Sequence, residues 1–122
     1  MRKLILKMSV SVDGFVSGPN GELEWVFDSI DDEVTAWIVD TLWQAGVHIM
    51  GSVTYNDMAA YWPNPRMQSR RNEPFAAPMN EIPLEGGLPL FKNLPGILNP
   101  KLQSVTTFPS GVVAHVYERA EM

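Results

Sequence analysis

The sequence predicts an α/β fold with a mostly parallel sheet that ends in an antiparallel hairpin. Three observations predict it. Residues 3–10 alternate in a strand-like pattern, and residues 47–50 form a short apolar run that is bounded by Gly51. A helix with one apolar face lies between them, so the two strands should be parallel and joined by a right-handed crossover. Residues 102–108 and 112–117 flank a Pro-Ser-Gly cluster and predict the hairpin.

The helix between the two strands is the clearest element of the chain. Ser29 occupies the expected N-cap position, and the acidic residues at positions 31–33 suit the positive end of the helix dipole. Gly46 is well placed to end the helix. Its apolar face consists of Val34, Trp37, Ile38, Leu42 and Ala45.

The middle of the chain predicts short helices and a long loop. Gly51 leads into a helix that should end by Trp62 and Pro63. Residues 63–74 are polar, basic and rich in proline, which predicts a surface loop. Residues 74–80 predict one or two helical turns that begin at the proline. The Gly86-Gly87 pair predicts a turn, so no strand is expected between Pro83 and this pair.

Length, charge and composition limit the possible functions. A chain of 122 residues predicts one domain, residues 1–122. A net charge of −5 argues against nucleic acid and against anionic membrane surfaces as partners. The chain has no cysteine, so we expect neither disulfides nor thiolate metal ligands, and we expect a cytoplasmic location. Lys7 interrupts the apolar start too early for a signal peptide.

Two loops follow the carboxyl ends of the two predicted parallel strands, where ligands bind in open α/β sheets. In the first loop, Ser11 and Asp13 can hydrogen-bond a polar heterocycle, although a simple Asp13-Gly14 turn is the favoured alternative. The second loop, Gly51 to Tyr55, opens a helix whose N–H groups can bind a phosphate. The alternative there is that Ser52 merely caps the helix.

The other polar residues are explained more readily by a structural role than by a functional one. Three arginines in the 63–74 loop can gather a phosphate, but a solvated loop is the favoured interpretation. His48 and His115 lie far apart in the sequence, so no metal site is expected. The acidic residues near position 31 favour a solvated helix start over a general acid.

Several stretches resemble one known family when they are taken in order. They are MSVSVDGFVSGPNGELEWVFD, VHIMGSVTY, YWP, PFAAPMNEIP and GLPLFKNLPGILNPKLQSVTTFPSGVVAHVYE. Together they resemble the bacterial dihydrofolate reductase-like family, which includes the reductase domain of bifunctional riboflavin-biosynthesis proteins. The resemblance covers nearly the whole chain from both ends.

This resemblance implies a Rossmann-like sheet and NADPH-dependent hydride transfer to a pterin-like or pyrimidine-like substrate. The riboflavin-biosynthesis member of the family is a 5-amino-6-(5-phosphoribosylamino)uracil reductase. By position, Ser11, Asp13 and Gly14 would lie beside the nicotinamide and the substrate. The cofactor-phosphate turn would contain Gly51, Ser52, Thr54 and Tyr55.

The chain departs from the family pattern in two ways. The family turn usually carries basic residues where this chain has Ser52 and Val53, which predicts weakened binding of NADPH. The family also continues after its MNEIP-like stretch into strands and a second phosphate loop. Here Pro83 is followed almost at once by Gly86-Gly87, so a deletion near residues 83–86 is inferred.

The deletion predicts a homodimer, because the loss of neighbouring strands leaves sheet edges and apolar surface uncovered. The alternative is that the remaining strands close up within one chain. Three functions stay open: an NADPH-dependent oxidoreductase, a non-catalytic binding module for a flavin, pterin or nucleotide, and a dimeric accessory protein. The missing basic turn favours the second and the third.

Overall fold

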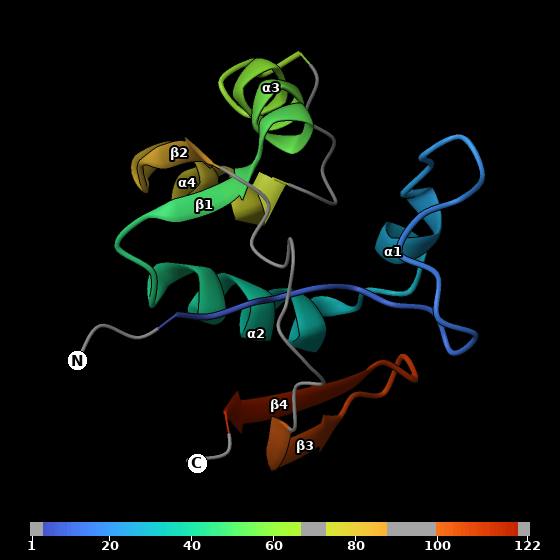
Figure 1. Cartoon of the computed structure of the whole chain (residues 1–122). Coiled ribbons are helices and arrows are strands. Elements are labelled where there is room, and N and C mark those ends of the chain that lie inside the picture. Colours follow the sequence, from blue (N-terminus) through green and yellow to red (C-terminus); the bar gives the residue numbers. More distant parts are fainter. Residues whose placement is uncertain (1–3, 67–72, 88–99, 120–122) are drawn as a thin grey trace.

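The computed structural model of the chain describes residues 4–66, 73–87 and 100–119. Within these ranges the chain is a mixed α/β structure, as the sequence predicts (Figure 1). The helices are α1 (Glu24–Asp28), α2 (Asp32–Trp43), α3 (Ser52–Tyr61) and α4 (Glu73–Glu81). The strands are β1 (His48–Gly51), β2 (Leu84–Gly87), β3 (Pro100–Thr107) and β4 (Val113–Arg119).

The described strands form two separate two-stranded sheets. Strand β1 pairs with β2 in parallel, from His48 opposite Leu84 to Gly51 opposite Gly87. Strands β3 and β4 form the predicted antiparallel hairpin, with an irregularity between Leu102 and Ser104. The hairpin prediction is therefore confirmed, and so is a strand at residues 48–50.

The predicted strand at residues 3–10 is wrong for the described part, residues 4–10, because these residues form no strand. The parallel partner of β1 is instead β2, in a stretch for which the sequence predicts a turn and no strand. The prediction of a turn at Gly86-Gly87 is thus also wrong. His48 N–H donates to the carbonyl of Pro83 at 2.8 Å, so the backbone that follows α4 begins to pair with β1 just after the helix ends. Backbone pairing with β1 outweighs the weak strand preference of two glycines.

Helix α2 is confirmed, but its ends differ from the prediction. Its N-cap is Asp31, whose Oδ1 accepts a hydrogen bond from the N–H of Val34 at 2.8 Å. The Ser29 hydroxyl is used elsewhere, because it donates to the carbonyl of Val26 in α1 at 2.7 Å. The helix ends at Trp43, before Gly46, and Gln44 is its C-cap.

The helices after β1 follow the prediction closely. Helix α3 ends before Trp62 and Pro63, as expected. Helix α4 begins at Glu73, so Pro74 is its second residue and not its first. Part of the predicted 63–74 loop, residues 67–72, lies outside the described residues. No helix of the described ranges is both long and apolar enough to cross a bilayer.

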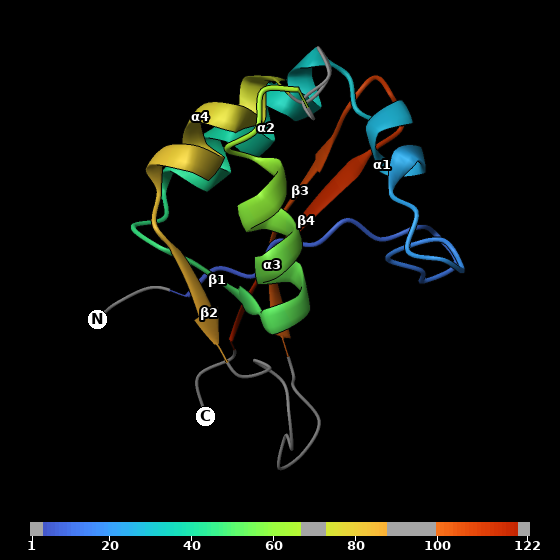
Figure 2. The same ribbon diagram turned by 90° about the horizontal axis from the view of Figure 1, so that it is seen from above.

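A small apolar core lies between α2 and α4, which run side by side in Figure 2. Each of its members stabilises the fold by roughly 1.5–3 kcal/mol through burial of the side chain. Neither residues 4–10 nor the hairpin strands contribute a member, although Phe108 and Val112 beside the hairpin turn pack against its edge. The core cluster consists of Val34, Ile38, Trp62, Phe75 and Met79.

The hairpin is attached to α2 through its turn. Asp31 Oδ2 accepts a hydrogen bond from the N–H of Ser110 at 2.9 Å, and the ring of Phe108 packs edge-on against Trp37, with ring centroids 6.2 Å apart. Gly111, at φ +88°, adopts the left-handed conformation that the turn requires. One carboxylate therefore caps α2 and also holds the hairpin turn.

This double role of Asp31 predicts acid-dependent stability. The hydrogen bond from the Val34 N–H, followed by that from Ser110, lowers the pKa of the Asp31 carboxyl below its ordinary value. A lowered pKa in the folded state stabilises the fold above the unfolded pKa of about 3.9, and this stabilisation is lost as the pH falls through the folded pKa. We expect Asp31→Asn to flatten this acid loss of stability, as measured by urea midpoints between neutral and acid pH. Asp32→Asn, which removes the same charge one residue later, is the control, and an equal flattening there would refute the role of Asp31.

Candidate functional site

The start of α3 lies at the carboxyl end of β1, as the sequence predicts for the cofactor-phosphate turn. Gly51 is both the last residue of β1 and the N-cap of α3, and no side chain caps the helix. Ser52 is the first helical residue, so the alternative in which it caps the helix is wrong. Ser52 and Thr54 are exposed, whereas Tyr55 is half-buried. An uncapped helix start presents N–H groups and a positive dipole end that suit an anion such as a phosphate.

The predicted nicotinamide-side loop forms a closed turn from Ser11 to Phe15. The Ser11 hydroxyl donates to Asp13 Oδ1 at 2.5 Å and accepts from the N–H of Phe15 at 2.9 Å. The backbone closes the turn through Gly14 N–H to the Ser11 carbonyl at 2.9 Å, with Gly14 at φ +93°. This geometry is the Asp-Gly turn that the residue types favour, and it uses both polar side chains within the turn.

The two predicted halves of the site do not share a cavity in the described residues. The Ser11–Phe15 turn lies on the same side of the molecule as α1, away from the start of α3 (Figures 1 and 2). A cavity of about 260 Å³ borders Gly51, but it does not reach Ser11, Asp13 or Ser52. Its walls come from the N-terminal segment and from the connection between α2 and β1. The lining residues are Leu4, Ile5, Leu6, Gln44, Ala45, Gly46, Val47, Ile49, Met50 and Gly51.

This cavity is the feature that the sequence prediction missed. No sequence pattern signalled it, because residues 3–10 and 47–50 were expected to form two parallel strands. The structure instead leaves open space where Leu4, Ile5 and Leu6 approach β1. Among the described residues, no backbone hydrogen bond joins residues 4–10 to another element.

The remaining polar candidates are two histidines in different sheets and the arginines of the 63–74 loop. His48 Nε2 lies 3.3 Å from the carbonyl of Pro78, and His115 lies on β4 in the other sheet. No group of three potential metal ligands comes together within the described ranges. Of the three arginines in the 63–74 loop, Arg66 donates its backbone N–H to Asn64 Oδ1 at 3.1 Å. The two others, Arg70 and Arg71, lie outside the described residues.

Comparisons of the chain with protein-family models, with curated proteins and with solved structures found no match. The resemblance to the dihydrofolate reductase-like family therefore stays a prediction from the quoted motifs.

Proposed function

We propose that the chain is a non-catalytic, dimeric binding module for a phosphate-bearing flavin, pterin or nucleotide. The observation that carries this proposal is the uncapped, exposed start of α3 directly after a parallel strand. A phosphate there would accept hydrogen bonds from the first-turn N–H groups and from the hydroxyls of Ser52 and Thr54. The absence of basic side chains at positions 52 and 53 predicts modest affinity and weak preference for NADPH.

The exposure of the Ser11–Phe15 turn supports binding without hydride transfer. Val12 is fully exposed, and Phe15 is 63% exposed. Hydride-transfer sites exclude water around the nicotinamide and its acceptor, and this turn offers no such shelter. The Ser11 hydroxyl already donates its hydrogen to Asp13 Oδ1, so it could donate to a substrate only if that bond broke. An active NADPH-dependent reductase of the riboflavin-biosynthesis type is the second candidate, supported by the order of Ser11, Asp13, Gly14 and Thr54.

A ligand titration tests the proposal. We expect flavin mononucleotide to change the fluorescence of the tryptophans saturably, whereas riboflavin, which lacks only the phosphate, should bind much more weakly. NADPH mixed with the bound flavin should not be oxidised. Equal binding of the two flavins, or no binding at millimolar ligand, would overturn the phosphate site. Oxidation of NADPH above the protein-free rate would instead show hydride transfer to the flavin and overturn the non-catalytic part of the proposal.

The cytoplasmic location and the dimer belong to the same proposal. The absence of cysteine from the sequence supports a reducing compartment. Extensive exposed apolar surface on the described residues supports a dimer, and the N-terminal segment carries much of it.

A further inference from the structure

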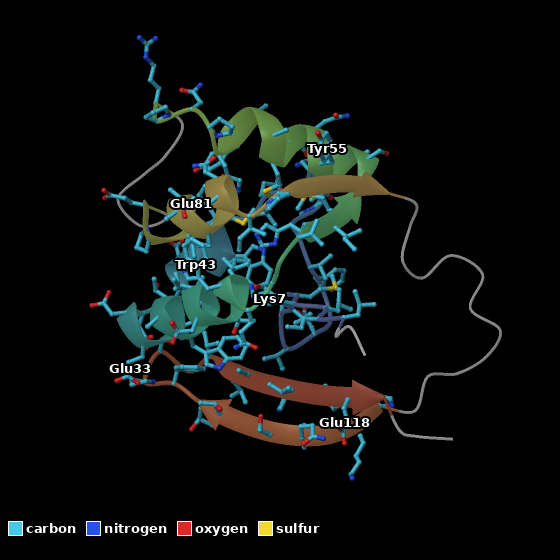
Figure 3. The ribbon with its side chains drawn as sticks, turned by 90° about the vertical axis from the view of Figure 1, so that its left-hand side faces the viewer. Lys7, Glu33, Trp43, Tyr55, Glu81 and Glu118 are labelled. Atoms are coloured by element: carbon cyan, nitrogen blue, oxygen red, sulfur yellow. The ribbon has the colours of Figure 1, made fainter. Side chains whose placement is uncertain are left out.

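The cavity of about 260 Å³ lies along the edge of β1 that faces away from β2. Val47, Ile49 and Gly51 line it on one side, and residues 4–6 of the N-terminal segment line it on the other. Figure 3 shows Lys7, in the same segment, between the β1–β2 pair and the β3–β4 hairpin. Among the described strands, only β2 pairs with β1. The cavity is therefore bordered by a strand edge with no described strand beside it.

The register of β1 decides which backbone groups face the cavity. His48 N–H donates to the carbonyl of Pro83 at 2.8 Å, so the backbone groups of His48 point toward β2. Successive residues of a strand direct their N–H and C=O groups to opposite edges, so Ile49 directs both of its groups toward the cavity. Within the described ranges, no hydrogen bond from outside the β1–β2 pair uses them. Ile49 thus presents one donor and one acceptor side by side.

The side chains around the cavity are almost all apolar. Among the described lining residues, Gln44 alone has a polar side chain, and none carries a charge. A charged group would lose its hydration here without gaining a charged partner, so the lining favours a neutral ligand. Apolar walls with a few well-placed polar groups are typical of sites that bind small organic molecules.

The volume of the cavity limits the size of the ligand. A cavity of ~150 Å³ holds one benzene ring, whereas sites for whole drug-sized ligands occupy about 300–1,000 Å³. A volume of about 260 Å³ therefore suits a fused ring system but is too small for a whole dinucleotide.

We infer that this cavity binds a fused heterocycle through its lactam edge, where a ring N–H lies beside a C=O, as in a pteridine or a flavin. The lactam N–H donates to the carbonyl of Ile49, and the lactam C=O accepts from the N–H of Ile49. Two residues exchange the same pair of bonds in an antiparallel sheet, so the ring edge takes the place of a strand residue beside β1. A ring without such an edge would leave both backbone groups unpaired, which is unfavourable.

Gly51 connects this cavity with the start of α3. It lines the cavity and is also the N-cap of the helix. A methyl group added at Gly51 would meet no atom within 4 Å beyond the neighbouring residues, so a ligand has room to extend from the cavity toward the helix start. The inference rests on the proposed function for the phosphate, and it adds the chemical class of the ring.

Methylation of the lactam nitrogen tests the two hydrogen bonds, because it removes the donor of the ring and leaves the phosphate unchanged. Equilibrium dialysis, with flavin absorbance as the measurement, should show that flavin mononucleotide binds about tenfold more tightly than its derivative methylated at this nitrogen. Equal affinities of the two ligands would overturn the inference.

Ile49→Trp tests the location of the ring. Ile49 is 56% exposed, lines the cavity and does not belong to the buried core, so the larger side chain should fill part of the cavity in a folded chain. Val105→Trp is the matched control, because Val105 is 50% exposed on β3 in the other sheet. We expect about a tenfold loss of affinity for flavin mononucleotide at position 49 and almost none at position 105. Equal losses, or no loss at position 49, would overturn the inference.

The ring site and the phosphate site can fail separately. A phosphate site alone would favour flavin mononucleotide over riboflavin, with no effect of lactam methylation or of Ile49→Trp. A ring site alone would bind the two flavins equally, with both effects present. No binding of either flavin at millimolar concentration would overturn both proposals.

Discussion

Replacing Trp62 by alanine is expected to lower the free energy of unfolding by about 3–5 kcal/mol, as expected for loss of a buried aromatic side chain. Trp62 is 7% exposed and belongs to the core cluster between α2 and α4. Its ring packs edge-on against Tyr61 at a centroid distance of 5.1 Å, and its Nε1–H donates to Met58 Sδ at 3.1 Å. Alanine removes all of these contacts and leaves a cavity. Because small domains have a free energy of unfolding of only about 5–15 kcal/mol, this one change should bring the chain close to unfolding.

Trp43→Ala is the matched control for this prediction. Trp43 is the last residue of α2, is 45% exposed and does not belong to the buried cluster. Its replacement should cost roughly 1 kcal/mol or less, because surface substitutions rarely cost more and alanine favours the helix. Urea denaturation followed by circular dichroism measures both variants. Equal losses of stability would show that the buried cluster does not hold the fold together.

The second large effect is expected at the start of α3, where Ser52→Asp should weaken binding of flavin mononucleotide by about tenfold or more through repulsion between two anions. The same change should not weaken the helix, since an acidic residue in the first turn interacts favourably with the helix dipole. The predicted changes in affinity and in stability therefore differ in sign. A variant that loses ligand while its urea midpoint stays level or rises cannot be explained by unfolding.

Asn56→Asp provides the control on the same helix. Asn56 is exposed and lies one turn further along α3, so the added charge is the same but the first-turn N–H groups are not directly affected. Its effect on the affinity for flavin mononucleotide should be well below that of Ser52→Asp. Equal effects at both positions would indicate general charge repulsion, and no effect at either would place the ligand elsewhere.

The choice of N-cap for α2 shows where local sequence reasoning reaches its limit. Ser29 and Asp31 are both good capping residues, and their side chains alone do not decide between them. Asp31 also binds the N–H of Ser110, which lies 79 positions away along the chain. Ser29 is meanwhile used to close α1, a short helix that the sequence analysis did not predict.

The candidate site was predictable only in its local parts. The turn at Gly51 and the helix after it follow from a glycine between an apolar run and a helical pattern. The turn at Asp13-Gly14 follows from the residue types alone. Whether these two turns lie close together depends on how the strands pair in the fold. In the described residues the two turns lie apart.

The sequence by itself determined the elements whose pattern is complete within one segment. These are the buried face of α2, with Val34 and Ile38, the strand-to-helix turn at Gly51, and the hairpin around Gly111. Only the tertiary structure decided that the glycine-rich residues 84–87 form a strand and that the apolar residues 4–10 do not. The physical reason is that a helix satisfies its hydrogen bonds within itself, whereas a strand exists only where another backbone lies beside it.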